Sequence, residues 1–350
     1  MTQQDSGLQR KVPDFFALLA VAFVVYISLL FFVVSLGSDQ VRAGENPRFV
    51  YPVHGSDSAG YVVLADNILE QKVFSQDAIS PFTPDTFRTP GYPFFLALFK
   101  FVFGSYTWFP LIQILCTVGV SFMVLRMGER LFSRTVGMIG AFLYLLDPTV
   151  ILHSLVLLSD STYVFLVVLT VYLLFFKSKE GSARERTMVV ATAGVVLGIS
   201  VLARPISMFL PAVLLPFYIF SVRADLSKKK IAQNTLLFIF GLCMLTVPWL
   251  VRNKNAVGVW GLSSVASFNL FFYYVPEFLA YDTHTSPDAM RARMQAELPA
   301  DVPLSSIALL QNTATINKIS LKYLSGHVVD YTKFHLVKTI PVFLSSGMKH

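Results

Sequence analysis

Long apolar runs separated by short polar connections dominate this chain. The first run, Phe15–Leu36, has 22 uncharged residues, which is enough to cross a bilayer as a helix. It is too long for the apolar core of a signal peptide, so we predict a retained transmembrane helix. The pattern as a whole predicts an all-α polytopic membrane protein. The further predicted spans are Trp108–Leu125, Thr135–Leu146, Ser161–Phe176, Met188–Ala203, Ile206–Phe220 and Ile231–Val251.

One apolar stretch is too short to count as a span. Gly91–Gly104 has 14 residues and contains Lys100, whereas a full crossing needs about 20 apolar residues. We therefore expect a re-entrant or juxtamembrane helix there. The third predicted span ends at Asp147-Pro148, because a proline disfavours helix at the residue before it.

Composition narrows the class of protein. The 350 residues are 54% hydrophobic and 14% charged, whereas soluble domains carry about 25% charged residues. Cys116 and Cys243 fall inside apolar runs, where they are expected to be small buried hydrophobes and not part of a disulfide framework or metal site. The net charge of +7 requires no nucleic-acid partner, because basic residues on one membrane face account for it.

The basic residues indicate the orientation. Loops on alternate sides of the predicted spans differ sharply in Lys and Arg, and the basic loops are expected to be cytoplasmic. This places the N-terminus in the cytoplasm. If Gly91–Gly104 were counted as a span, every later loop would be assigned to the opposite side of the membrane. The basic residues assigned to the inner face are Arg10, Lys11, Arg126, Arg130, Arg134, Lys177, Lys179, Arg184, Arg186, Arg223, Lys228, Lys229 and Lys230.

Two large segments are then expected on the outer face. Residues 37–107 form the first outer loop, and residues 252–350 form an outward-facing extension after the last span. We expect residues 1–251 to be one transmembrane module. The extension could stop short of further spans.

The first loop contains a predicted amphipathic helix. Tyr61, Leu64, Ala65 and Ile68 recur at helical spacing, and Asp57 stands at the start of that helix. Asp57 has two interpretations: an ordinary helix cap, or a catalytic carboxylate.

Four more charged residues stand where predicted membrane segments begin or end. Arg88 precedes the apolar stretch that contains Tyr92, Asp160 starts the fourth span, Arg204 lies in a tight outer turn, and Arg252 closes the seventh span. Singly, each has a structural explanation, such as a helix cap or an interfacial arginine. Together they place arginines on the face where positive charge is disfavoured, which favours an anionic partner.

Arginine at an apolar interface suits phosphate, because its planar guanidinium donates paired hydrogen bonds. The sequence therefore predicts an outward-facing site for an amphiphilic phosphate, with one acid available as general base. His54 lies three residues before Asp57 and could line this site or be a surface histidine. No phosphate-binding loop, serine-nucleophile motif or metal-ligand spacing is present in the sequence.

The ordered set of these motifs resembles the polyprenyl-phosphate-sugar-dependent glycosyltransferases of the GT-C fold, which include protein O-mannosyltransferases and lipid A aminoarabinose transferases. The resemblance runs from about Val12 to Asn253. Its carriers are Asp57-Ser58-Ala59-Gly60-Tyr61, Arg88-Thr89-Pro90-Gly91-Tyr92-Pro93, Leu158-Ser159-Asp160, Leu202-Ala203-Arg204-Pro205 and Pro248-Trp249-Leu250-Val251-Arg252-Asn253.

The resemblance implies roles for these positions. Asp57 would be the catalytic base in a transfer that inverts the anomeric carbon, and Arg88 and Arg204 would bind the donor phosphate. Arg252 is a weaker addition to these donor-phosphate residues, and Asp160 would have a supporting role in the site. The remaining supporting residues of the predicted site are Tyr61, Tyr92 and His54.

The resemblance also implies partners and location. The donor would be a polyprenyl-phosphate sugar, and the acceptor a glycan, lipid or protein, in contact with membrane lipids. Many relatives have two adjacent acids in the first loop, whereas Ser58 follows Asp57 here, so a divalent metal is not supported and no cofactor is expected. The protein would lie in the plasma (inner) membrane with its site on the periplasmic or extracellular side.

Two other function classes stay open at this point. A transporter or flippase for a lipid-linked sugar would also carry charged residues in a helical bundle, although no inverted repeat is visible. A non-catalytic lipid-binding subunit of an assembly is the third class. Loss of the sugar donor on incubation with the purified protein would separate the enzyme from both.

Overall fold

The computed structural model describes residues 12–42, 44, 46, 50–53, 55–300, 302 and 306–344, which form helices, turns and loops with no β-strand among them. The chain divides into two compact units. The first is Met1–Lys72 with Gly91–Leu245, and the second is Val73–Pro90 with Thr246–His350.

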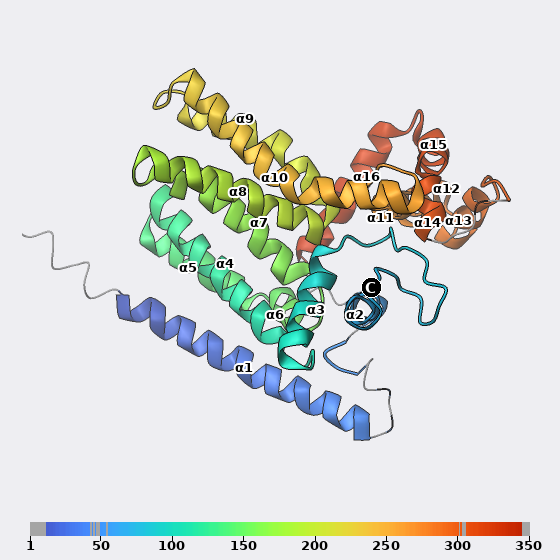
Figure 1. Ribbon diagram of the computed structural model, residues 1–350, viewed down its shortest axis with the longest axis horizontal. Helices are drawn as coiled ribbons and strands as arrows, with labels where there is room; N and C mark the ends of the chain where they lie inside the picture. Colours follow the sequence, from blue (N-terminus) through green and yellow to red (C-terminus); the bar gives the residue numbers. More distant parts are fainter. Residues whose placement is uncertain are drawn as a thin grey trace, which may run out of the picture. The chain divides into compact units, whose positions relative to one another are not determined.

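The first unit is a helical bundle. Its elements are α1 (Val12–Arg42), α2 (Gly55–Glu70), α3 (Gly91–Phe103), α4 (Pro110–Leu131), α5 (Arg134–Leu146), α6 (Pro148–Leu155), α7 (Asp160–Phe175), η1 (Lys177–Lys179), α8 (Ala183–Ala203), η2 (Pro205–Phe209), α9 (Leu210–Val222) and the first part of α10 (Lys228–Val257). Figure 1 shows α4 beside α5 and α7 beside α8, and α4 also packs against α7.

The predicted membrane class is confirmed. Within the described residues, six helices are long and apolar enough to cross a membrane, and the bent pair α5–α6 would make a seventh span. These segments are Ala22–Arg42, Phe109–Leu131, Asp160–Lys179, Ala183–Ala203, Pro205–Val222 and Lys228–Val257. The protein is therefore an all-α polytopic membrane protein.

The bend of 55° between α5 and α6 lies at the predicted proline break. Asp147 adopts an extended backbone, and its side chain accepts hydrogen bonds from the backbone N–H groups of Thr149 and Val150. Pro148 is the first residue of α6, where its missing N–H costs no helical hydrogen bond. One apolar run thus becomes two short helices.

The helix predicted in the first loop is α2, and it packs against α3. Tyr61 and Ala65 of α2 share a buried cluster with Tyr92 and Leu96 of α3. α3 has only 13 residues and is not among the helices long enough to span, so the prediction of a helix too short to cross is confirmed. Its placement as a re-entrant or juxtamembrane helix stays a prediction.

Gly91 allows α3 to begin directly against the end of α8. A Cβ atom at Gly91 would lie 2.6 Å from the carbonyl carbon of Leu202, which is closer than real Cβ atoms approach backbone. The first turn of α3 therefore contacts the backbone just before Arg204.

The basic connections of the first unit meet at one end of the bundle. Arg130, near the end of α4, forms an ion pair with Glu180 and donates a hydrogen bond to the carbonyl of Phe176 after α7. Asp160 and Arg204 stand at the opposite ends of α7 and α8 from this cluster. The Arg130–Glu180 pair and the Asp160–Arg204 pair thus lie at opposite ends of these helices.

The second unit contains the loop Val73–Pro90 and the last part of α10. Its helices after α10 are α11 (Val265–Asn269), η3 (Leu270–Tyr274), α12 (Val275–Thr283), α13 (Pro287–Gln295), α14 (Ser306–Gln311), α15 (Thr313–Leu324) and α16 (Val328–Leu344). Phe271, Phe278, Met294 and Ile316 are buried in their common core. This unit has its own hydrophobic core, which qualifies it as an independent packing unit.

Candidate active site

Asp160 and Arg204 form an ion pair at one end of the first unit. Arg204 Nη2 lies 2.5 Å from Asp160 Oδ2, and the side chains are 37% and 27% exposed. Arg204 follows the last residue of α8, and Asp160 is the first residue of α7, so helix ends fix both backbones. The pair is open enough for a ligand to reach the guanidinium.

Ser159 connects this pair to the first-loop helix. Its hydroxyl is buried, accepts a hydrogen bond from Arg204 Nε at 2.9 Å, and lies 3.3 Å from the hydroxyl of Tyr61. The Arg204 guanidinium also lies over the ring of Tyr163, 5.6 Å from its centroid. Arg204 therefore has a fixed orientation before any ligand binds.

The stretch that carries Ser159 is held by buried hydrogen bonds from three directions. Gln113 donates from Nε2 to the carbonyls of His153 and Val156, at 2.9 and 2.7 Å. Ser58 donates to the carbonyl of Leu157 at 2.9 Å. The N–H of Leu157 in turn donates to the carbonyl of Pro52.

Asp57 lies in the first turn of α2 with an exposed side chain. The helix begins at Gly55, so Asp57 is its third residue and not the residue that precedes it. A carboxylate in this turn interacts favourably with the helix dipole. Tyr61 follows four residues later and therefore lies on the same face of α2 as Asp57.

Tyr61 and Tyr92 pack against each other next to Ser159. Their rings meet edge to face with centroids 4.8 Å apart, and both residues are buried. The Tyr92 hydroxyl donates to Gln113 Oε1 at 2.8 Å. The predicted residues Tyr61, Asp160 and Arg204 are thus linked through Ser159, and Tyr92 packs against Tyr61.

Arg88 belongs to the second unit, where the loop Val73–Pro90 folds around a buried acid. Asp85 is 3% exposed, and its Oδ1 accepts from the backbone N–H of Arg88 at 2.9 Å. Its Oδ2 accepts from Gln76 Nε2 at 2.5 Å. Burial raises the pKa of Asp85 above its ordinary value. The Arg88 guanidinium lies over the ring of Phe87.

Arg252 is engaged by protein groups in the same unit. Nη1 donates to the carbonyl of Asp85 at 2.8 Å, and Nη2 donates to the carbonyl of Phe74 at 3.2 Å. The rings of Trp249 and Phe74 lie next to the guanidinium. Arg252 therefore anchors the loop Val73–Pro90, and its role toward a phosphate stays a prediction.

Sequence reasoning missed Ser159 and Gln113 as parts of the site. Both are polar residues at positions buried by folding, and only their long-range partners reveal them. His54, predicted to support the site, lies outside the described residues. Within the described part of the chain, no group of three or more His, Cys, Asp or Glu side chains is placed to hold a metal ion.

Comparison with known proteins supports the class of enzyme. Residues 87–249 match the family model of dolichyl-phosphate-mannose-protein mannosyltransferases. The match confirms the resemblance to GT-C glycosyltransferases and indicates a membrane enzyme that uses a polyprenyl-phosphate-linked sugar. It begins after Asp57, so it carries no information on that residue. Searches of curated proteins and of solved structures found no match.

Proposed function

We propose that this GT-C-type glycosyltransferase moves a sugar from a polyprenyl phosphate to an acceptor on the outer face of the membrane, with Asp57 as general base. The observation that carries the proposal is the link from the Asp57 helix through Tyr61 and Ser159 to a half-exposed arginine. An accessible acid and an accessible cation on one connected frame are what this reaction requires.

The reaction proceeds by a single displacement. The acceptor hydroxyl loses its proton to Asp57 while its oxygen forms a bond to the anomeric carbon. The bond from that carbon to the phosphate oxygen breaks, and polyprenyl phosphate leaves with the electron pair. Attack from the side opposite the leaving group inverts the anomeric centre.

Arg204 acts on the leaving group. The phosphate gains negative charge as the bond breaks, so a fixed guanidinium stabilises the transition state more than the bound donor. Ser159 and Tyr163 hold Arg204 in place, and Asp160 keeps its charge balanced in the absence of donor. Asp160 is thus a positioning residue.

Arg88 and Arg252 enter this proposal on the sequence resemblance, as donor-phosphate residues. Tyr92 and Tyr61 support the frame through packing. The acceptor could be a glycan, a lipid or a protein. No metal takes part in the proposed steps.

The proposed orientation rests on charge. Arg130 and Glu180 join the basic connections at one end of the bundle, whereas Asp160 and Arg204 stand at the other helix ends. Because basic ends face the cytoplasm, the Arg204 end would face the periplasm or the cell exterior, with a cytoplasmic N-terminus. The proposed location is the plasma (inner) membrane.

The test uses purified protein in nanodiscs with a polyprenyl-phosphate sugar and a hydroxyl acceptor, and it follows release of polyprenyl phosphate. Asp57→Asn should lower the rate about 10²–10⁴-fold, the range expected for loss of a general base. The matched control is Glu70→Gln, which neutralises another exposed acid of α2 and should leave the rate unchanged. Full activity of the Asp57→Asn protein would refute the assignment, and a carrier would leave the donor intact.

A further inference from the structure

A pocket lies against a different face of α2 from the one that carries Asp57. Asp57 and Asp66 are nine residues apart, which is about two and a half helical turns, so their side chains leave α2 in opposite directions. Asp66 lines a cavity of about 430 Å³ together with the end of α1, the segment 50–53 and the segment 104–107. This volume is within the range of small-molecule sites, roughly 300–1,000 Å³.

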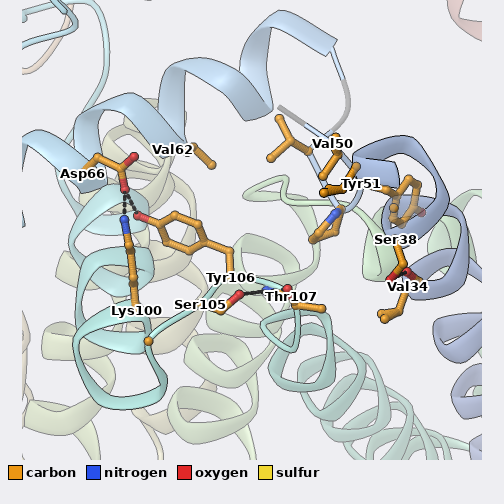
Figure 2. A pocket seen from close by; sticks show the side chains of 15 residues that line it. Val34, Ser38, Val50, Tyr51, Val62, Asp66, Lys100, Ser105, Tyr106 and Thr107 are labelled. Carbon is orange, nitrogen blue, oxygen red and sulfur yellow. Dashed lines mark hydrogen bonds and ion pairs between the residues drawn. The ribbon is translucent and has the colours of Figure 1, made fainter. Parts of the chain in front are cut away.

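The polar end of this pocket is a partly buried hydrogen-bonded cluster, which Figure 2 shows. Asp66 Oδ1 accepts from Lys100 Nζ and from the Tyr106 hydroxyl, both at 2.7 Å. The Asp66 side chain is 3% exposed, and Lys100 is 27% exposed. Lys100 Nζ also lies 3.6 Å from Glu70. Lys100 therefore faces two carboxylates, and the group of three charges is net negative.

This charge balance determines which head groups can bind. Asp66 and Lys100 line the pocket, and Glu70 adds a second carboxylate near Lys100 from outside the lining. An anion such as a phosphate would therefore meet the Asp66 carboxylate beside an ammonium that is already paired, and a cation would meet the ammonium itself. Hydroxyl groups satisfy both, because they donate to carboxylates and accept from the ammonium. Ser38, Ser105 and Thr107 add hydroxyls to the wall, and burial raises the pKa of Tyr51 to about 12, which keeps its phenol a donor.

The rest of the pocket is apolar and lies at the end of a candidate membrane span. Val34 and Val41 line it from α1, and Val62 lines it from α2. Val34 and Val41 belong to the span Ala22–Arg42, whose last turns are where bilayer hydrocarbon gives way to head groups. The occupant should thus have an apolar part as well as a polar one.

We propose that this pocket binds an amphiphile with an uncharged, hydroxyl-rich head group, as in a glycolipid. The hydroxyls contact Lys100, Tyr106 and Asp66, and the apolar part lies against the valines. This site is separate from Arg204 and stands independently of the reaction proposed above.

The experiment measures equilibrium binding of radiolabelled octyl β-glucoside, below its micelle concentration, to the full chain in phosphatidylcholine nanodiscs. Empty nanodiscs give the background from partition into lipid. We expect one saturable site per chain, with octyl phosphate and octyltrimethylammonium at least tenfold weaker as competitors. Equal displacement by octyl phosphate, or no saturable binding, would overturn the proposal.

A matched pair of variants locates the binding. Ser38 lines the pocket with an exposed side chain, so Ser38→Phe should fill it without removing a buried contact and should weaken binding at least tenfold. Ser35 is an exposed serine of the same helix that does not line the pocket, so Ser35→Phe should bind as the native chain does. Equal loss in both variants, or in neither, contradicts the assigned location. Hydrolysis of the sugar donor without an acceptor, measured as release of polyprenyl phosphate, should persist in Ser38→Phe. This readout distinguishes a failure of the pocket proposal from a failure of the catalytic proposal.

Discussion

The two mixed-charge pairs on either side of α2 differ in how far water reaches them. Asp160 is 27% exposed beside Arg204, whereas Asp66 is 3% exposed beside Lys100. An accessible pair costs little to open, because water or a ligand replaces the lost partner. A buried acid that loses its cation keeps an uncompensated charge. The Arg204 pair can therefore open to admit a charged ligand, whereas the Asp66 pair should stay closed as part of the pocket wall and contact an uncharged ligand without coming apart.

The largest expected effect tests the buried contact that fixes the candidate active site. Ser58 is fully buried and donates to the carbonyl of Leu157, so Ser58→Asp would bury a carboxylate against a carbonyl oxygen. We expect a loss of about 3–5 kcal/mol in the free energy of unfolding, measured by SDS titration in mixed micelles. Ser58→Ala, which loses one hydrogen bond, should cost only about 1 kcal/mol. Equal stability of the two variants would show that the acid finds a partner there.

The second prediction removes one cation from each pair. Lys100→Met should lower the free energy of unfolding by about 2 kcal/mol, because Asp66 stays buried without its ammonium. Arg204→Met should cost less than about 1 kcal/mol, because water reaches Asp160. The same SDS titration measures both.

Activity should show the reverse order. Arg204→Met removes the proposed phosphate contact, so the KM for the donor should rise and kcat should fall. Lys100→Met, assayed at a temperature where it stays folded, should keep the native kcat. If both variants lost transfer equally, the two sides of α2 would not be functionally separate.

The third prediction concerns the backbone approach that sets Arg204. In Gly91→Ala the new methyl group would lie 2.6 Å from the carbonyl carbon of Leu202, so α3 and α8 must move apart. Overpacking of this kind costs about 1–3 kcal/mol. We expect lower thermal stability together with reduced transfer. Gly104→Ala meets no atom within 4 Å and tests the effect of substituting a glycine at the other end of α3, although its positive φ adds local strain.

The smallest effect is a pH dependence in the second unit. Two acids of the loop Val73–Pro90 differ in burial as the two pairs do: Asp85 is buried and Asp77 is partly exposed. Burial raises the pKa of Asp85, so its contribution to stability is present below its ordinary value of 3.8 and is lost as the pH rises through the folded pKa. Hydrogen bonds from Thr83 lower the pKa of Asp77, so its contribution is present above 3.8 and is lost as the pH falls through its lower folded pKa.

The measurement is the thermal unfolding midpoint between pH 3 and pH 7, a range set by the ordinary carboxyl pKa of about 4. Asp85→Asn should gain stability relative to the native chain as the pH rises, and Asp77→Asn should lose it. Parallel curves for both variants would contradict the opposite signs.

Much of the fold could be predicted from the sequence, because membrane helices follow from the length of apolar runs. The break at Asp147-Pro148 and the presence of a helix around Asp57 were also predictable, since each depends on neighbours in sequence. The helix is α2, which begins at Gly55. The exact helix ends were less predictable: α1 reaches Arg42, six residues past the predicted end of the first span. Polar residues beyond an apolar run continue a helix without any hydrophobic signal.

The candidate site was only partly predictable. The charged residues Asp160 and Arg204 stood out in apolar surroundings, and they do form a pair. Their connection through Ser159 could not be predicted, because serine has no distinctive pattern and its partners are 45 and 98 residues away. Lys100 interrupted an apolar run without explanation until folding placed it against Asp66.

Gln113 has a consequence for the time course of a catalytic cycle. The side-chain amide of Gln113, which belongs to α4, donates hydrogen bonds to the segment 153–159. Ser58 and Pro52 form hydrogen bonds with the same segment from the first loop. A segment tied at so many points does not open and shut as a lid. Side-chain rotation of the exposed Asp57, which takes picoseconds to nanoseconds, is then the fastest adjustment to an arriving substrate. Lipid diffusion or the chemical step would then limit the rate of turnover, and opening of the segment 153–159 would not.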